Sequence, residues 1–105
     1  MAVSEAELDT LRPSGVRLRR CLSDTMAAHR LDAWICPSAV DEAPFGLATT
    51  GSPLMNQPWT HAGMPAVTVP AGKGPGGLPL GIQLVGPFMA DERLVDLSVR
   101  LERCL

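Results

Sequence analysis

Pro58–Gly86 reads PWTHAGMPAVTVPAGKGPGGLPLGIQLVG, and this stretch decides the fold. Within it, Ala66–Pro70 alternates β-branched residues with other types, a pattern typical of a strand. Leu80–Val85 is a second apolar run of strand length. The glycine-rich link Gly72–Gly77 lies between the two runs. We therefore predict two strands that pair as a hairpin, with a wider connection as the open alternative.

After this stretch, Asp91–Leu105 predicts an amphipathic helix. Acidic residues stand in its first turn and arginines in its last, as the helix dipole favours. The apolar residues recur at helical spacing and form one face. That face consists of Leu94, Leu97, Ser98, Leu101 and Leu105.

Before the stretch, the chain is expected to be helical over residues 1–30. Helical spacing of leucines predicts a helix from about Gly15 to Arg30 and a shorter one over Ser4–Leu11. Pro13 and Gly15 argue against one continuous helix. Ser4 followed by Glu7 fits a capping box at the start of the first helix.

Between helix and hairpin, Ala33–Cys36 predicts a short buried strand that Pro37 ends. Ser38–Met64 lacks apolar periodicity and is rich in proline and glycine, so we expect a long loop. The fold class is α/β, with about three strands of a mixed sheet, one helix before and one helix after. Residues 1–105 form a single segment, and 31–105 hold the strands, the loop and the final helix. Such a small sheet would leave an edge open, which suggests that the segment belongs to a larger domain.

Composition excludes several classes of function. The formal net charge of −2 gives no reason to expect nucleic acid as a partner, and Arg17, Arg19 and Arg20 are expected to form a solvated helix face. No run approaches the roughly 18 apolar residues of a membrane span, and the acidic start lacks the apolar core of a secretory signal. We therefore expect a cytoplasmic protein without a membrane partner.

The three cysteines show no metal-ligand spacing and no disulfide framework. Cys21, Cys36 and Cys104 are far apart and odd in number, so we expect buried, reduced thiols and no metal. The segment around Lys73 (GKGPGG) invites a phosphate-loop interpretation. However, Lys73 is followed by Gly74 and then by a strand, whereas a phosphate loop leads into a helix.

Trp59 and His61 are the candidates for substrate binding, and both are weak. Trp59 could line a pocket, although packing under the loop is the favoured interpretation. His61 is a lone histidine in the expected loop, where a structural hydrogen bond is commoner than catalysis. Ser52 follows Gly51 but lacks the G-x-S-x-G pattern of a nucleophile elbow.

Two motifs resemble the C-terminal part of amidase-signature enzymes. They are W-T-x-x-G-x-P-A-x-T-x-P-A-G, starting at Trp59, and G-L-P-x-G-x-Q-L-V-G, starting at Gly77. The order strand, loop, motif, motif and acidic-start helix is similar as well, and the amidotransferase A-subunit type shares it. The resemblance implies hydrolysis of carboxamide C–N bonds, without metal or organic cofactor. It also implies a serine nucleophile activated by a second serine and a lysine, all upstream of the motifs.

This sequence departs from that catalytic pattern. Its only lysine is Lys73 in the glycine turn, and its serines are never adjacent, so no catalytic residue is carried over. We expect a C-terminal portion that is inactive alone, with the remainder of an amidase domain or a complementary chain as its partner and a homo-oligomer as a further option. A small amide is expected as a substrate only of the complete enzyme. The alternative is a non-catalytic relic or interaction module of the same fold, and an independent small enzyme is the least favoured option.

Overall fold

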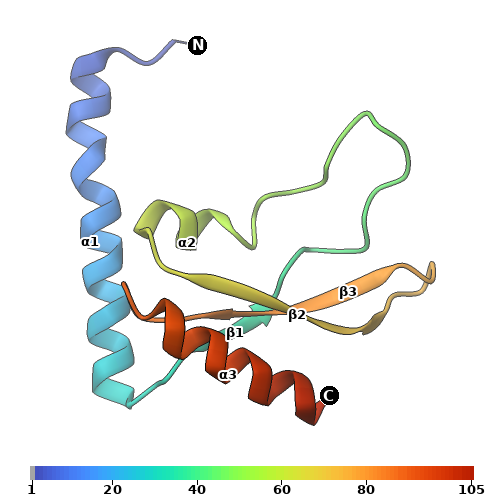
Figure 1. Cartoon of the computed structure of the whole chain (residues 1–105). Coiled ribbons are helices and arrows are strands. Elements are labelled where there is room, and N and C mark those ends of the chain that lie inside the picture. The colour runs from blue at the N-terminus through green and yellow to red at the C-terminus, as the bar shows by residue number, and fades with distance from the viewer. Residues whose placement is uncertain (1) are drawn as a thin grey trace.

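The structure, a computed structural model, describes residues 2–105 as an α/β arrangement of three helices and three strands (Figure 1). The predicted fold class is confirmed. Their bounds are α1 Glu5–His29, β1 Trp34–Pro37, α2 Gln57–Ala62, β2 Ala66–Lys73, β3 Pro79–Val85 and α3 Asp91–Cys104.

The sheet has the order β1-β3-β2, and β3 pairs antiparallel with both neighbours. β2 and β3 form the predicted hairpin, with Val67 opposite Leu84 and an irregularity between Pro70 and Gly72. Both pairings are antiparallel, where a mixed sheet was expected. β1 and β2 run in the same direction, but they do not pair because β3 lies between them. Gly72 and Gly77 have positive φ at the hairpin tip, as the glycine-rich link requires.

Each face of the sheet carries a separate apolar cluster. On one face, α3 packs over β2 and β3, and Leu94 is buried against Val69 and Leu84. On the other face, Val85 packs with residues of α1 and α2, among them Met26 and Ala62. Because side chains of a strand alternate between faces, neighbouring Leu84 and Val85 anchor opposite layers.

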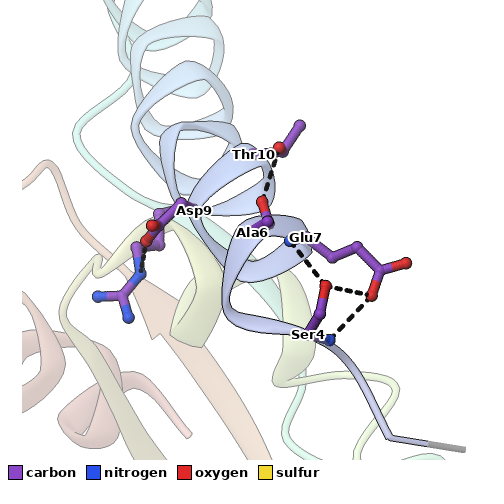
Figure 2. A network of polar contacts seen from close by, with 6 residues as sticks. Ser4, Ala6, Glu7, Asp9 and Thr10 are labelled. Carbon is purple, nitrogen blue, oxygen red and sulfur yellow. Dashed lines mark hydrogen bonds and ion pairs between the residues drawn. The ribbon is translucent and has the colours of Figure 1, made fainter.

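The prediction of two N-terminal helices is wrong, because α1 runs unbroken from Glu5 to His29 with Pro13 inside it. Proline removes one backbone donor, which leaves the carbonyl of Asp9 without its usual partner. This part of α1 is exposed, so water can satisfy that carbonyl. The predicted capping box is confirmed: the Glu7 amide donates to the Ser4 hydroxyl, and the Glu7 carboxylate accepts from the Ser4 amide at 2.8 Å (Figure 2).

The expected long loop is shorter than predicted, because α2 occupies its last third. Pro58 stands in the first turn of α2, where a missing amide donor costs nothing. Gly63 ends the helix with a φ of 68°. The loop proper, 38–56, projects beyond the sheet (Figure 1).

The cysteines are free, as expected, but the prediction that they are buried is wrong for two of them. Cys21 and Cys104 are exposed, and Cys36 on β1 is half-buried. Cys21 lies on α1 and Cys104 is the last residue of α3, and neither belongs to the two clusters.

Candidate functional site

Trp59 lies on α2 and packs against Trp34 of β1. The two ring centroids are 6.4 Å apart with an interplanar angle of 30°, and both rings border the cluster of Met26 and Val85. This is the position that the packing interpretation of Trp59 expects. Both indole nitrogens are buried without a hydrogen-bond partner among residues 2–105. Each unpaired buried donor costs on the order of 1–3 kcal/mol of stability, and the stack contains two of them.

His61 has a partner, although the sequence presents it as a lone histidine. Its Nε2 lies 2.8 Å from the hydroxyl of Ser14 on α1, and the contact joins positions 47 residues apart. One group donates and the other accepts, according to the tautomer of the ring. An activated serine also needs an oriented base and oxyanion donors. Within residues 2–105 no acidic group bonds the ring, so the pair has the form of a structural contact.

The same junction brings the C-terminal end of α2 against α1. A Cβ at Gly15 would lie 2.5 Å from the His61 carbonyl oxygen, so only glycine permits this approach. Arg19 donates from Nε to the Ala62 carbonyl at 2.7 Å, and its guanidinium lies 3.7 Å from the Phe88 ring centroid. The prediction of a solvated arginine face is therefore wrong for Arg19, which closes the end of α2.

A hollow of about 530 Å³ lies between β1, the chain that follows it and the hairpin. Its lining is mostly apolar and consists of Ile35, Cys36, Pro37, Ser38, Ala39, Val40, Asp41, Ala71, Pro79, Leu80, Gly81 and Ile82. Ser38 holds the start of the loop, because its amide donates to the Gly81 carbonyl at 3.1 Å.

Glu42, in the loop that follows β1, forms a hydrogen bond with the hairpin tip. Its carboxylate accepts from the Gly76 amide at 2.8 Å. A Cβ at Gly74 or Gly76 would overlap that carboxylate, so the glycines make room for it. The glycine turn thus holds an acidic side chain of the same chain, which agrees with rejecting the phosphate-loop interpretation of Lys73.

Residues 2–105 contain neither a metal-ligand cluster nor a membrane-spanning helix. Across residues 2–105, no three His, Cys, Asp or Glu side chains come together in a way that could hold a metal ion. None of the helices in this part of the chain is long and apolar enough to span a membrane. Gln83 is buried and donates to the Met55 carbonyl at 3.2 Å, which ties β3 to the loop.

The first motif thus covers most of α2 and β2 and the turn at Gly63 that joins them, and the second motif covers β3. A family comparison agrees with this arrangement. A family model described as Amidase matches residues 2–95. The chain belongs to the amidase family.

Curated relatives extend this assignment. The A subunit of the Neisseria gonorrhoeae glutamyl-tRNA(Gln) amidotransferase is 34% identical over 94 residues, covering 82% of this chain and 20% of the relative. The Maricaulis maris protein of the same name is 34% identical over 100 residues, covering 88% of this chain and 20% of the relative. The chain therefore spans about a fifth of the length of these relatives.

A solved structure shows the same fold. The A subunit of the Thermotoga maritima glutamyl-tRNA(Gln) amidotransferase superimposes with a TM-score of 0.70 at 24% identity, covering 94% of this chain and 23% of that one. The amidase resemblance drawn from the two motifs is confirmed. The contacts that sequence reasoning missed, Ser14 with His61 and Glu42 with Gly76, join distant positions and left no local signal.

Proposed function

We propose that this chain is the C-terminal portion of an amidase-family hydrolase that cleaves carboxamide C–N bonds. The observation that carries the proposal is the family match over residues 2–95 in a chain whose serines are never adjacent. Its only lysine, Lys73, lies at the end of β2 by the hairpin tip. The Ser-Ser-Lys machinery of the proposed mechanism lies outside this chain, and no metal or organic cofactor takes part.

The partner in this proposal is the remainder of an amidase domain, on the same or a complementary chain. Two facts support it: the chain covers a fifth of its relatives, and its sheet has only three strands. The relatives are named as subunits, which favours assembly with further subunits. A cytoplasmic location is part of the proposal, because reduced thiols persist in that compartment and all three cysteines are free.

A non-catalytic interaction module of the same fold is the second candidate. Its support is that Trp59 and His61, the two substrate-binding candidates, make packing and hydrogen-bond contacts within the chain. In the hydrolase proposal these residues hold α2 in place, and the substrate pocket is completed by the missing part.

The test is reconstitution. The Maricaulis maris relative without its matched segment is mixed with this chain, and ammonia release from simple carboxamides is measured. We expect release from the mixture and none from either piece alone. Hydrolysis by the isolated chain that a Ser14→Ala or His61→Ala substitution abolishes would instead show an independent enzyme.

A further inference from the structure

The loop that follows β1 ends in a tip, residues 44–51, with two large apolar side chains that no described residue covers. Phe45 and Leu47 are both fully exposed to solvent. A Cβ at Gly51 would lie 3.6 Å from the Pro44 ring, so the two arms of the loop meet at the base of this tip. Burial of such side chains is favourable, because it removes apolar surface from water. The loop tip is therefore a compact turn that gains stability from any apolar cover within its reach.

Few contacts hold the loop tip in its observed position. Within the described part of the chain, the hydrogen bonds of residues 43–52 span only two positions along the sequence. On the side of β1, the bond from the Gly76 amide to the Glu42 carboxylate is the nearest tie to the sheet. Because this bond is exposed, water can replace it, and its net contribution is small. One weak bond thus separates the observed position of the loop tip from others.

The hollow beside β1 lies within reach of Phe45. Asp41 lines the hollow, and the four residues from there to Phe45 span at most about 14 Å when extended. The lining next to Asp41 is aliphatic and includes Ile35, Leu80 and Ile82. Its volume of about 530 Å³ is in the range of cavities that hold small organic molecules, roughly 300–1,000 Å³, so a phenyl ring fits.

We propose that the loop tip is a lid that closes on the hollow by placing the Phe45 ring in it, and that the Glu42–Gly76 hydrogen bond is the latch that holds this lid open. Closing removes the ring and the aliphatic lining from water together. The latch opposes closing, because Glu42 must leave the hairpin tip before Phe45 can turn toward the hollow. The open hollow admits small uncharged apolar molecules, and the closed lid excludes them.

Loss of the latch shifts the lid toward its closed state. The shift equals the net free energy of one exposed hydrogen bond, which corresponds to a roughly two- to tenfold change in the ratio of closed to open lid. The lid is open in the structure, so the closed state is the minor one. Without the latch the loop exchanges between the two states and is held in neither.

The test is methyl nuclear magnetic resonance on the isotope-labelled chain. We expect nuclear Overhauser contacts from the Phe45 ring to the methyl groups of Ile35 and Ile82, together with a ring-induced shift of the Ile82 methyl. Glu42→Ala should strengthen the contacts and raise the ratio of closed to open lid, read from that shift, about two- to tenfold. Phe88→Leu, which changes the other phenylalanine of the chain, should leave both readouts unchanged.

Gly76→Ala breaks the latch from the opposite side. Its Cβ would overlap a carboxylate oxygen of Glu42, so the carboxylate is displaced although it is still present. We expect the same change as for Glu42→Ala. The methyl groups of Leu94, which is buried under α3, report that each variant is folded.

Access to the hollow is measured with N-phenyl-1-naphthylamine, a neutral apolar dye, by the response of the Ile82 methyl to its addition. Glu42→Ala should raise the Kd of the dye, and Phe45→Ser added to that variant should return it to the wild-type value or below. Absence of contacts between Phe45 and the hollow in the wild type and both unlatched variants overturns the lid. Equal contacts in all three proteins overturn the latch, and a dye that leaves the Ile82 methyl unchanged overturns the proposed access.

Discussion

The hydroxyl of Ser14 and the Nε2 atom of His61 lie 2.8 Å apart and join α1 to α2. This contact stands one residue after Pro13, where the helix loses a backbone hydrogen bond. Gly15 follows directly. Because it has no Cβ, the His61 carbonyl oxygen can lie 2.5 Å from the place that this atom would occupy. Tertiary contact with α2 thus supports α1 next to its weakest internal point.

We predict that Ser14 and His61 are coupled in stability. In a double-mutant cycle of Ser14→Ala and His61→Ala, measured by urea unfolding, the coupling free energy should be roughly 0.5–1 kcal/mol, toward the low end for a hydrogen bond because the pair is exposed. Thr10→Ala with His61→Ala is the matched control, since Thr10 bonds only within its own helix. Coupling of the control pair as large as that of Ser14 with His61 would refute the contact.

Gly15→Ala should destabilise the chain, although alanine is the better helix former by roughly 1 kcal/mol. The added Cβ would meet the His61 carbonyl oxygen at 2.5 Å, and backbone on both sides leaves little room to yield. A lower midpoint of urea unfolding is expected. A rise in the midpoint by the propensity alone would mean that α1 and α2 do not touch there.

Glu42→Ala should free the loop over residues 38–56 from the hairpin tip. The substitution removes the acceptor of the Gly76 amide, a bond between positions 34 residues apart. We expect faster cleavage within 38–56 in limited proteolysis. Glu42→Gln keeps an acceptor oxygen, so the loop of this variant should be cleaved at a rate between those of wild type and Glu42→Ala. Equal cleavage rates for all three proteins would contradict the contact.

The N-terminus of α1 should loosen at low pH. Hydrogen bonds from the Ser4 amide and then the Ser4 hydroxyl hold the pKa of Glu7 below its ordinary value of 4.5 (Figure 2). Because the pKa is lower in the folded chain, the stabilisation is present above pH 4.5 and disappears as the pH falls through the lowered pKa. The protection of the Ser4 amide, measured as its exchange rate relative to the intrinsic rate at the same pH, should be lost over that interval, and Glu7→Gln should remove the step.

Leu94→Ala should destabilise the chain by about 2–5 kcal/mol, because Leu94 is 1% exposed and anchors α3 on the sheet. Val99→Ala on the exposed side of the same helix is the control and should change stability by less than about 0.5 kcal/mol. Urea unfolding of both variants distinguishes the two sites. A loss at Leu94 no larger than at Val99 would mean that α3 is not docked.

The sequence predicts the hairpin and α3 well, because their apolar periods and turn residues are local. It divides α1 into two helices and misses α2, because in both places a proline predicts a break where the structure has a helix. Pro13 is tolerated because the carbonyl that it leaves unpaired is on an exposed part of α1, and Pro58 stands in the first turn of its helix. The partner of His61 leaves no sequence signal, because Ser14 is 47 residues away and only the folded chain brings the two together.

The most direct measurement is the rate of ammonia release from carboxamides by this chain mixed with the Maricaulis maris relative that lacks the matched segment. We predict that the mixture hydrolyses amides and that each piece alone does not. Hydrolysis that is unchanged when this chain is omitted would contradict its role as the C-terminal portion of an amidase. So would the absence of hydrolysis from both the mixture and a single chain that carries this segment in place of the relative's matched segment.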